Sequence, residues 1–182
     1  YTTGNTLSLH DALPISLREA FAGRPVWLAA STHPGEEALA LEAAAATRLP
    51  GLLTIVAPRH PERGAEVAAL AAERGLAAAR RSTGEWPEGA AVYVADTLGE
   101  MGLWYRLAPL AFLGGSTGTL GGHNPWEPAA LGCAIAHGPD TRNFAEAYDA
   151  LRRAEAAWPV SDAADLAAAI AASAAPAGGA TA

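Results

Sequence analysis

The sequence predicts a doubly wound α/β domain built on a parallel, Rossmann-like sheet. Short apolar segments alternate with helical segments along the chain, and this alternation is typical of βαβ units. The apolar segments do not alternate with polar residues, as expected of strands that helices cover on both faces. Ligands of such sheets bind beyond the carboxyl ends of the strands, so we expect a site in the loops that follow them.

The first half of the chain supplies four of the expected strands, over residues 26–30, 52–57, 76–79 and 91–95. A helix over 36–47 opens with two acids, which favour the positive end of the helix dipole, and Pro50 stops it because proline cannot continue a helix. A second helix over 62–74 is closed by Gly75. Glycine and proline mark the polar loop that follows the third strand.

The second half continues the pattern. A turn over 96–100 leads into a helix that ends near residue 107, and a strand over 110–113 runs into a glycine-rich loop. Asn124 and Pro125 are predicted to start the next helix, since asparagine caps helices and proline suits their first turn. The remaining expected elements are a strand over 133–136, a helix over 143–153, a strand over 158–160 and a helix over 163–173 that Asp162 caps.

One domain is expected over residues 17–174, because a chain of 182 residues suits a single core. Residues 1–16 have no sustained period and run abruptly into the first helical segment, so we interpret them as a non-native or disordered tail. Residues 175–182 are small residues at the end of the chain and are expected to form a disordered tail.

Composition excludes several classes of protein. The net charge of −7 argues against a general nucleic-acid or anionic-membrane surface, and no stretch reaches the roughly 20 apolar residues that span a bilayer. A lone cysteine, Cys133, allows no internal disulfide and favours a reducing compartment. The chain has no lysine, which excludes a P-loop, and no cysteine pair or histidine spacing typical of metal ligands. We therefore expect neither a metal nor a cofactor.

Four polar clusters each follow a predicted strand, and the topology should gather them on one rim of the sheet. Together they contain histidines, an arginine and two glutamates, which indicates a pocket. The clusters are residues 31–33, 58–60, 96–100 and 123–127.

Each candidate also has a structural explanation. Arg59 would clamp a phosphate or a base carbonyl, or else pair with Glu62 at a helix start. His33 and His60 precede prolines in turns, where a structural role is as reasonable as a ligand contact. His123 lies beside two glycines, where little else needs an imidazole, which favours a functional role.

The two glutamates leave the same choice open. Glu100 would favour a helix dipole or face a ligand. Glu127 falls in the first turn of its helix, where its carboxylate would either cap the helix or accept hydrogen bonds from sugar hydroxyls. The glycine-rich loop before that helix would bring backbone N–H groups up to an anion.

A hydrolase motif overlaps the glycine-rich loop but lacks its context. Gly114, Ser116 and Gly118 have the Gly-x-Ser-x-Gly spacing of a nucleophile elbow. An elbow turns directly into its helix, whereas the helix signal here waits until Asn124. The partners should follow as an acid and then a histidine, and no histidine lies beyond His137. We therefore do not favour a hydrolase.

The ordered motifs resemble one family. The segments Ala-Ser-Thr-His-Pro-Gly-Glu-Glu (30–37), Pro-Arg-His-Pro-Glu-Arg (58–63), Asp-Thr-Leu-Gly-Glu (96–100) and Gly-Gly-His-Asn-Pro-Trp-Glu-Pro (121–128) occur in this order. Gly138-Pro139 and Asn143-Phe144 close the run. This order resembles the C-terminal half of 3-deoxy-D-manno-octulosonic acid (Kdo) transferases, from about residue 24 to 173. These enzymes are similar to other GT-B glycosyltransferases, which have two facing Rossmann-like domains.

The resemblance implies the site residues by motif, with Glu127 accepting the ribose hydroxyls and with no catalytic residue in this half, because the general base belongs to the N-terminal half. The helix start near Glu127 and the glycine-rich loop would stabilise the phosphate as it leaves. The expected CMP contacts are Pro58, Arg59, Leu98, Gly99, Glu100, Asn124, Pro125, Trp126 and Glu127. The expected contacts with the donor sugar or phosphate are Ser31, His33, His60, Ser116 and His123.

The resemblance also implies the reaction and its place. The chain would be the donor-binding half of a glycosyltransferase that moves Kdo from CMP-Kdo to a lipid A precursor in lipopolysaccharide biosynthesis. The N-terminal half would carry a membrane anchor to the cytoplasmic face of the inner membrane and the acceptor site, so this soluble half would not transfer alone. Leu98 and Trp126 depart from the methionine and leucine common in the family. Two alternatives are another nucleotide-sugar enzyme, such as a UDP-sugar transferase or epimerase, and a non-catalytic nucleotide-binding module.

Overall fold

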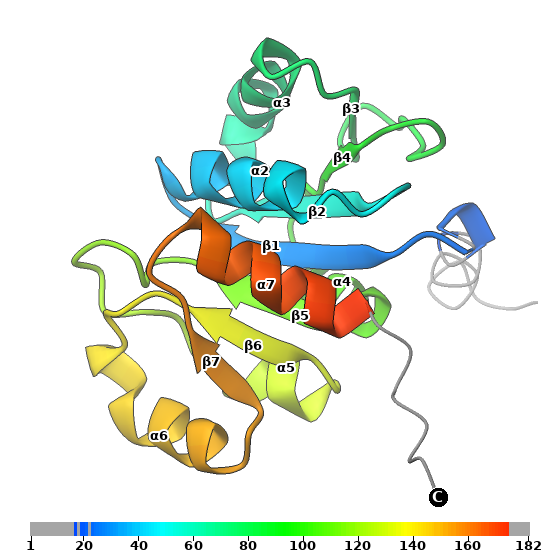
Figure 1. Cartoon of the computed structure of the whole chain (residues 1–182). Coiled ribbons are helices and arrows are strands. Elements are labelled where there is room, and N and C mark those ends of the chain that lie inside the picture. Colours follow the sequence, from blue (N-terminus) through cyan, green and yellow to red (C-terminus); the bar gives the residue numbers. More distant parts are fainter. Residues whose placement is uncertain (1–16, 18, 22, 175–182) are drawn as a thin grey trace, which may run out of the picture.

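The computed structural model describes residues 17, 19–21 and 23–174, so the two tails expected over 1–16 and 175–182 lie outside the described residues. A seven-stranded parallel sheet in the order β3-β4-β2-β1-β5-β6-β7 runs through the domain (Figure 1). The strands are β1 (Val26–Thr32), β2 (Leu53–Pro58), β3 (Ala78–Arg80), β4 (Val92–Val94), β5 (Leu110–Leu113), β6 (Ala134–His137) and β7 (Ala157–Pro159). The predicted doubly wound, Rossmann-like fold is confirmed.

Helices connect the strands and cover both faces of the sheet. They are α2 (Glu36–Thr47), α3 (Gly64–Glu73), α4 (Met101–Leu107), α5 (Trp126–Ala130), α6 (Ala145–Arg153) and α7 (Ala163–Ala174). Helices α2 and α7 cross the near face in Figure 1, and α4 lies behind the sheet. The core accordingly divides into two clusters of buried side chains, one on each face.

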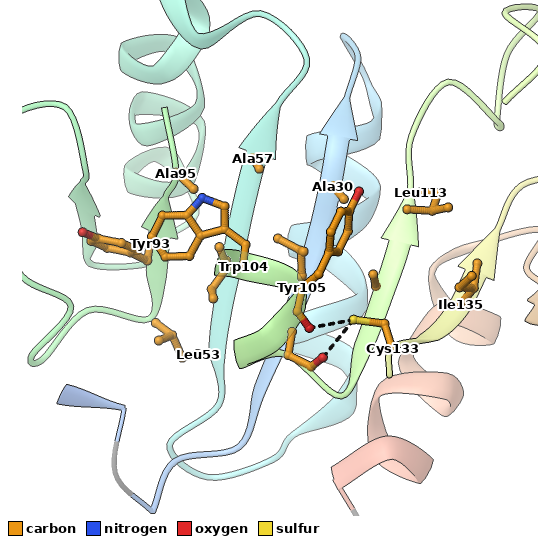
Figure 2. Close-up of a cluster of buried hydrophobic side chains, with 14 of the residues drawn as sticks. Ala30, Leu53, Ala57, Tyr93, Ala95, Trp104, Tyr105, Leu113, Cys133 and Ile135 are labelled. Carbon is orange, nitrogen blue, oxygen red and sulfur yellow. Dashed lines mark hydrogen bonds between the residues drawn. The ribbon is translucent and has the colours of Figure 1, made fainter. Parts of the chain in front are cut away.

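The strands contribute to both clusters, because successive side chains of a strand point to opposite faces of the sheet. In β1, Trp27 packs in the cluster under α2 and α7, whereas Leu28 packs in the opposite cluster. Trp104 and Tyr105 of α4 are buried in the same cluster as Leu28, and Trp104 meets the ring of Tyr93 edge-on (Figure 2). Burial of such aromatic side chains accounts for much of the apolar area that holds α4 on the sheet.

The lone thiol belongs to the same cluster. The Sγ atom of Cys133 lies 2.9 Å from the carbonyl oxygen of Tyr105 and 3.1 Å from that of Ala108, at the end of α4 (Figure 2). Burial raises the pKa of the Cys133 thiol to about 11. The cysteine is therefore a neutral packing residue and a weak donor to two carbonyls.

Some element boundaries differ from those predicted. The helix predicted over 62–74 is divided into a 3₁₀ turn (Pro61–Arg63) and α3, which begins at Gly64, where a side chain would overlap Asp96. The third strand lies one to two residues later than predicted, and the helix predicted to start after Asn124 is α5, which spans only five residues. The N-cap residue is Pro125 rather than the predicted Asn124, which lies one residue earlier and whose Oδ1 accepts a hydrogen bond of 3.0 Å from the Trp126 N–H.

The strand order places a topological switch point at one rim of the sheet. β1 pairs with β2 on one side and with β5 on the other, so the chain reverses its winding direction between β1 and β5. Ligands of doubly wound sheets bind at this point, beyond the carboxyl ends of the strands, and we refer to the space above the loops that follow β1 and β5 as the crevice. Among the described residues, none of the helices is both long and apolar enough to cross a bilayer.

Candidate functional site

The four polar clusters lie together at the carboxyl rim of the sheet, as predicted. They follow β1, β2, β4 and β5, which are neighbours in one parallel sheet. The Arg59 N–H donates a 2.9 Å hydrogen bond to the Thr32 carbonyl, which joins the first two clusters beyond the ends of their strands. The sheet therefore brings together side chains that lie up to 90 residues apart in the sequence, such as His33 and His123.

Three imidazoles stand at the mouth of the crevice. The Nε2 atoms of His33 and His123 are 3.1 Å apart, and their rings are stacked with centroids 5.3 Å apart. The ring of His60 meets His33 edge-on at 6.1 Å. Burial is the main cause that lowers the pKa of His33 and of His123. A neighbouring histidine (His60 for His33, and His33 for His123) and then Arg59 lower it further. Both are therefore predominantly neutral at pH 7, and the Nε2–H of one ring donates a hydrogen bond to the Nε2 of the other.

Arg59 is exposed beside these histidines. The ion pair with Glu62 that sequence reasoning left open does not form; instead, His60 Nδ1 lies 3.8 Å from Glu62. Among the described residues, no carboxylate forms an ion pair with Arg59. Its guanidinium is thus available to an anion and already influences both crevice histidines.

The glycine-rich loop already holds an anion, and that anion belongs to the protein. The carboxylate of Glu36 accepts hydrogen bonds from the backbone N–H groups of Gly115, at 2.8 Å, and of Ser116 and Thr117, both at 3.2 Å. Such a concave run of N–H groups is an anion-binding nest. The expectation that this part of the loop contacts a leaving phosphate is therefore wrong for these three N–H groups.

Ser116 is corrected for a related reason. Its side chain is fully buried, and its hydroxyl donates to the Leu113 carbonyl at 2.5 Å and accepts the Gly138 N–H at 2.8 Å. The residue thus ties the loop to the start of the segment after β6 and does not reach the rim. The same burial rules out Ser116 as a hydrolytic nucleophile.

The cluster after β4 is partly committed to internal pairs. Arg81 forms a two-bond ion pair with Glu100, at 2.9 and 3.1 Å, and the Thr97 hydroxyl also donates to this carboxylate. The pair holds the turn over 97–100, in which Gly99 has a φ of +79° and Leu98 is 83% exposed. Leu98 and the backbone of Gly99 therefore face solvent, while the Glu100 carboxylate serves the turn.

Glu127 lies across a short gap from that turn. A methyl group added to Gly102, in the first turn of α4, would lie 3.8 Å from Glu127 Oε1, so the carboxylate is directed towards α4. It accepts no hydrogen bond from any described residue, and the side chain is exposed. The helix-capping role left open for Glu127 is therefore not present, because its carboxylate accepts no N–H of the first turn among the described residues.

The rest of this cluster has mixed exposure. Pro125 is buried, Asn124 and Trp126 are exposed, and the Trp126 side chain is 51% exposed rather than packed into the core.

Ser31, in the cluster after β1, is half-buried and has a positive φ of 52°, close to the Gly114 backbone. Within the described part of the chain, no group of three or more metal-ligating side chains is placed to hold a metal ion.

Comparisons with known proteins agree with the resemblance seen in the motifs. No family model matches the chain. Two relatives named 3-deoxy-D-manno-octulosonic acid transferase are each 41% identical: one from Haemophilus influenzae over 145 residues (78% of this chain) and one from Bordetella pertussis over 160 (81%). The chain spans only 34% and 37% of their lengths.

A solved structure, described as the C-terminal CMP-Kdo binding domain of WaaA from Acinetobacter baumannii, matches with a TM-score of 0.82 and 35% identity. That match covers 89% of this chain and 87% of the solved one. The chain belongs to the Kdo transferase family.

Two residues of this Kdo transferase domain were missed by sequence reasoning as parts of the site. Glu36 was assigned only to the acidic start of a helix, and Arg81 only to a polar loop. A signal existed for the first, since Glu36 follows Gly35 soon after a predicted strand, as Glu100 follows Gly99 and His123 follows Gly122. Nothing in the local pattern pointed to the second.

Proposed function

We propose that this domain binds CMP-Kdo at the described rim and is the donor-binding half of an enzyme that transfers Kdo to a lipid A precursor. The observation that carries the proposal is the match, over 87% of its length, to a solved domain described as CMP-Kdo binding. The geometry supports it, because the motif residues that the resemblance assigns to CMP lie along one rim.

The nucleoside would lie over the gap between the turn after β4 and α5. Leu98 and Trp126 offer exposed apolar surface for a base, and the Glu127 carboxylate, without a hydrogen bond to any described residue, suits the ribose hydroxyls. Glu100 would act through Arg81 and the turn that the pair shapes, with the Gly99 backbone facing the ligand. Asn124 and Pro125 would set the position of α5.

The phosphate would lie at the mouth of the crevice. Transfer breaks the bond between the sugar and a phosphate oxygen, so the departing CMP gains a negative charge. Arg59, Pro58 before it, and the imidazoles of His33, His60 and His123 would surround that charge, and the positive guanidinium would stabilise it. Helix α5 has only five residues, so its dipole would contribute less than that of a longer helix.

The acceptor, the general base and the membrane attachment would belong to the parts of the relatives' length that this chain does not span. The proposed enzyme would act at the cytoplasmic face of the inner membrane, as a GT-B glycosyltransferase with this domain as its donor half. This domain alone would bind the donor without transferring it.

The test is calorimetric titration of the chain with CMP and with UDP. We expect CMP to bind and UDP to bind far more weakly; binding of UDP with no response to CMP would contradict the proposal. Glu127→Ala should weaken CMP binding by about 1–3 kcal/mol, as for a lost hydrogen bond to a charged group, with an unchanged melting temperature. Glu42→Ala, an exposed glutamate on α2, is the matched control and should change neither quantity.

A further inference from the structure

Glu36 is a buried carboxylate held almost entirely by backbone donors. It is 4% exposed and lies at the start of α2, directly under the crevice. Besides the three N–H groups of the glycine-rich loop, it accepts the Thr117 hydroxyl at 2.8 Å and the N–H of His33 at 2.9 Å. These five hydrogen bonds connect the loop after β1 with the loop after β5 across the point where the sheet reverses direction.

The adjacent Glu37 shows that this arrangement is not a general property of the helix start. Glu37 is also buried, at 1% exposure, but its carboxylate is paired with Arg63 at 2.6 Å and with the Thr32 hydroxyl at 2.9 Å. That is a side-chain ion pair between α2 and the 3₁₀ turn. In the described part of the chain, no cation forms an ion pair with Glu36, so loop backbone supplies the compensation that a buried charge requires.

The hydrogen bonds of Glu36 determine where the crevice histidines stand. One carboxylate oxygen, Oε2, accepts the backbone N–H of His33 and also the N–H of Gly115. Gly115 in turn lies directly under the imidazoles, since an added methyl group would be 3.1 Å from His123 Nε2 and 3.6 Å from His33 Cδ2. The carboxylate thus fixes the backbone beneath His33 and His123, whose Nε2 atoms are 3.1 Å apart.

We propose that Glu36 is a positioning residue of the phosphate subsite, a built-in carboxylate that fills the loop nest and directs the ligand's phosphate outward to Arg59 and the His33–His123 pair. The inference rests on the proposed function, because it concerns how CMP is held. It differs from the common use of such a loop, in which the nest itself receives the phosphate.

Charge supports this placement. His33 is faced by Glu36 and Glu37 from α2, by His60 and Arg59 from the loop after β2, and by His123 from the loop after β5. Burial and the cations lower its pKa, whereas Glu36 is the largest influence that raises it. Glu36 therefore favours a protonated His33 when an anion approaches, and removing its charge should shift the pH dependence of CMP binding to lower pH.

The experiment compares two ligands on two variants. Wild type, Glu36→Ala and Glu37→Ala are titrated with CMP and with cytidine, which lacks the phosphate. We expect Glu36→Ala to bind CMP about tenfold more weakly, a loss of about 1.4 kcal/mol, and cytidine unchanged. Sodium acetate should restore much of the CMP affinity, because the small carboxylate can occupy the vacated nest. Glu37→Ala should lower the melting temperature without an acetate-dependent change in CMP affinity.

Other results would overturn the inference. Equal losses for CMP and cytidine, or no acetate effect, would reduce Glu36 to a structural residue. Tighter CMP binding by Glu36→Ala would show that the nest itself is a phosphate site that Glu36 blocks. If Glu36→Ala loses its cooperative melting transition, the same titrations and pH profile are measured on Glu36→Gln, which keeps one acceptor oxygen. Failure of the wild type to bind CMP would instead overturn the proposed function.

Discussion

The carboxyl rim has two parts that satisfy their polar groups in opposite ways. In the crevice between β1 and β5, the Glu36 carboxylate is buried and accepts five hydrogen bonds from the chain itself. Across the gap between α4 and α5, the Glu127 carboxylate is exposed and accepts none from the described residues. The first part is preorganised by the fold, and the second offers its hydrogen-bonding capacity to a ligand. Mutations in the crevice should therefore change stability first, and mutations across the gap should change binding first.

The largest effect should come from crowding the crevice. A side chain at Gly114 would overlap the Ser31 carbonyl oxygen and approach Glu36 Oε2 to 2.7 Å, and backbone cannot move aside cheaply. We expect Gly114→Ala to lower the free energy of unfolding by about 3 kcal/mol, measured by chemical denaturation. Gly118→Ala is the control in the same loop, because nothing lies within 4 Å of an added methyl group there. Equal stability of the two variants would show that the crevice is not tightly packed.

An intermediate effect should separate two arginines four residues apart. Arg63→Ala would leave Glu37 buried without its cation and should cost about 2–3 kcal/mol of stability. Arg59→Ala should change stability by no more than about 0.5 kcal/mol, because its side chain is exposed, yet should weaken CMP binding, more so at low salt. Thermal melts and titrations on both variants measure this difference. If Arg59→Ala were the more destabilising change, its assignment to the ligand would not hold.

The smallest effect concerns pH. Burial lowers the pKa of His33, His123 and His137 below the ordinary histidine value of 6.5, so the unfolded chain binds protons more readily than the folded one. Their contribution to stability is complete above pH 6.5 and declines as the pH falls through 6.5 towards the folded values. Melts between pH 7.5 and 5 should show this decline.

His137 offers a way to sharpen that measurement. Its Nδ1 bonds the Gly138 carbonyl at 2.7 Å, while its buried Nε2 has no hydrogen-bond partner among the residues that the structure describes, so a second proton would be poorly accommodated. His137→Asn should reduce the slope of stability against pH, because it removes the buried imidazole that disfavours a second proton. A slope that persists in His137→Asn would assign the effect to the crevice pair.

Sequence reasoning succeeded where a property is local or periodic. The apolar strands, the helix-stopping Pro50 and Gly75, and the position of four polar clusters after strands all follow from short-range rules, and the structure confirms them. Once the strands are parallel, the gathering of the clusters on one rim is a geometric necessity. The motifs then identified the family that the comparisons show.

It failed where a residue's role depends on a distant partner. Glycine-rich loops attract anions, but which anion fills this one depends on Glu36, 79 residues before Gly115 in the sequence. Ser116 is a similar case, because its hydroxyl accepts a hydrogen bond from the Gly138 N–H, which β6 brings into position. Such pairings arise from the register of neighbouring strands, which local patterns do not encode. The roles assigned to Arg59 and Glu127 stay predictions until a ligand is titrated.

The environment of Cys133 has a practical consequence for those titrations. Its thiol is buried and protonated at neutral pH, so maleimide and related reagents should leave the native chain unmodified. A single cysteine introduced at the exposed Leu98 would then carry a fluorophore at one defined place, with no background from the native thiol. The domain would thereby become its own optical reporter for nucleotides, and occupancy of the rim could be followed at concentrations too low for calorimetry.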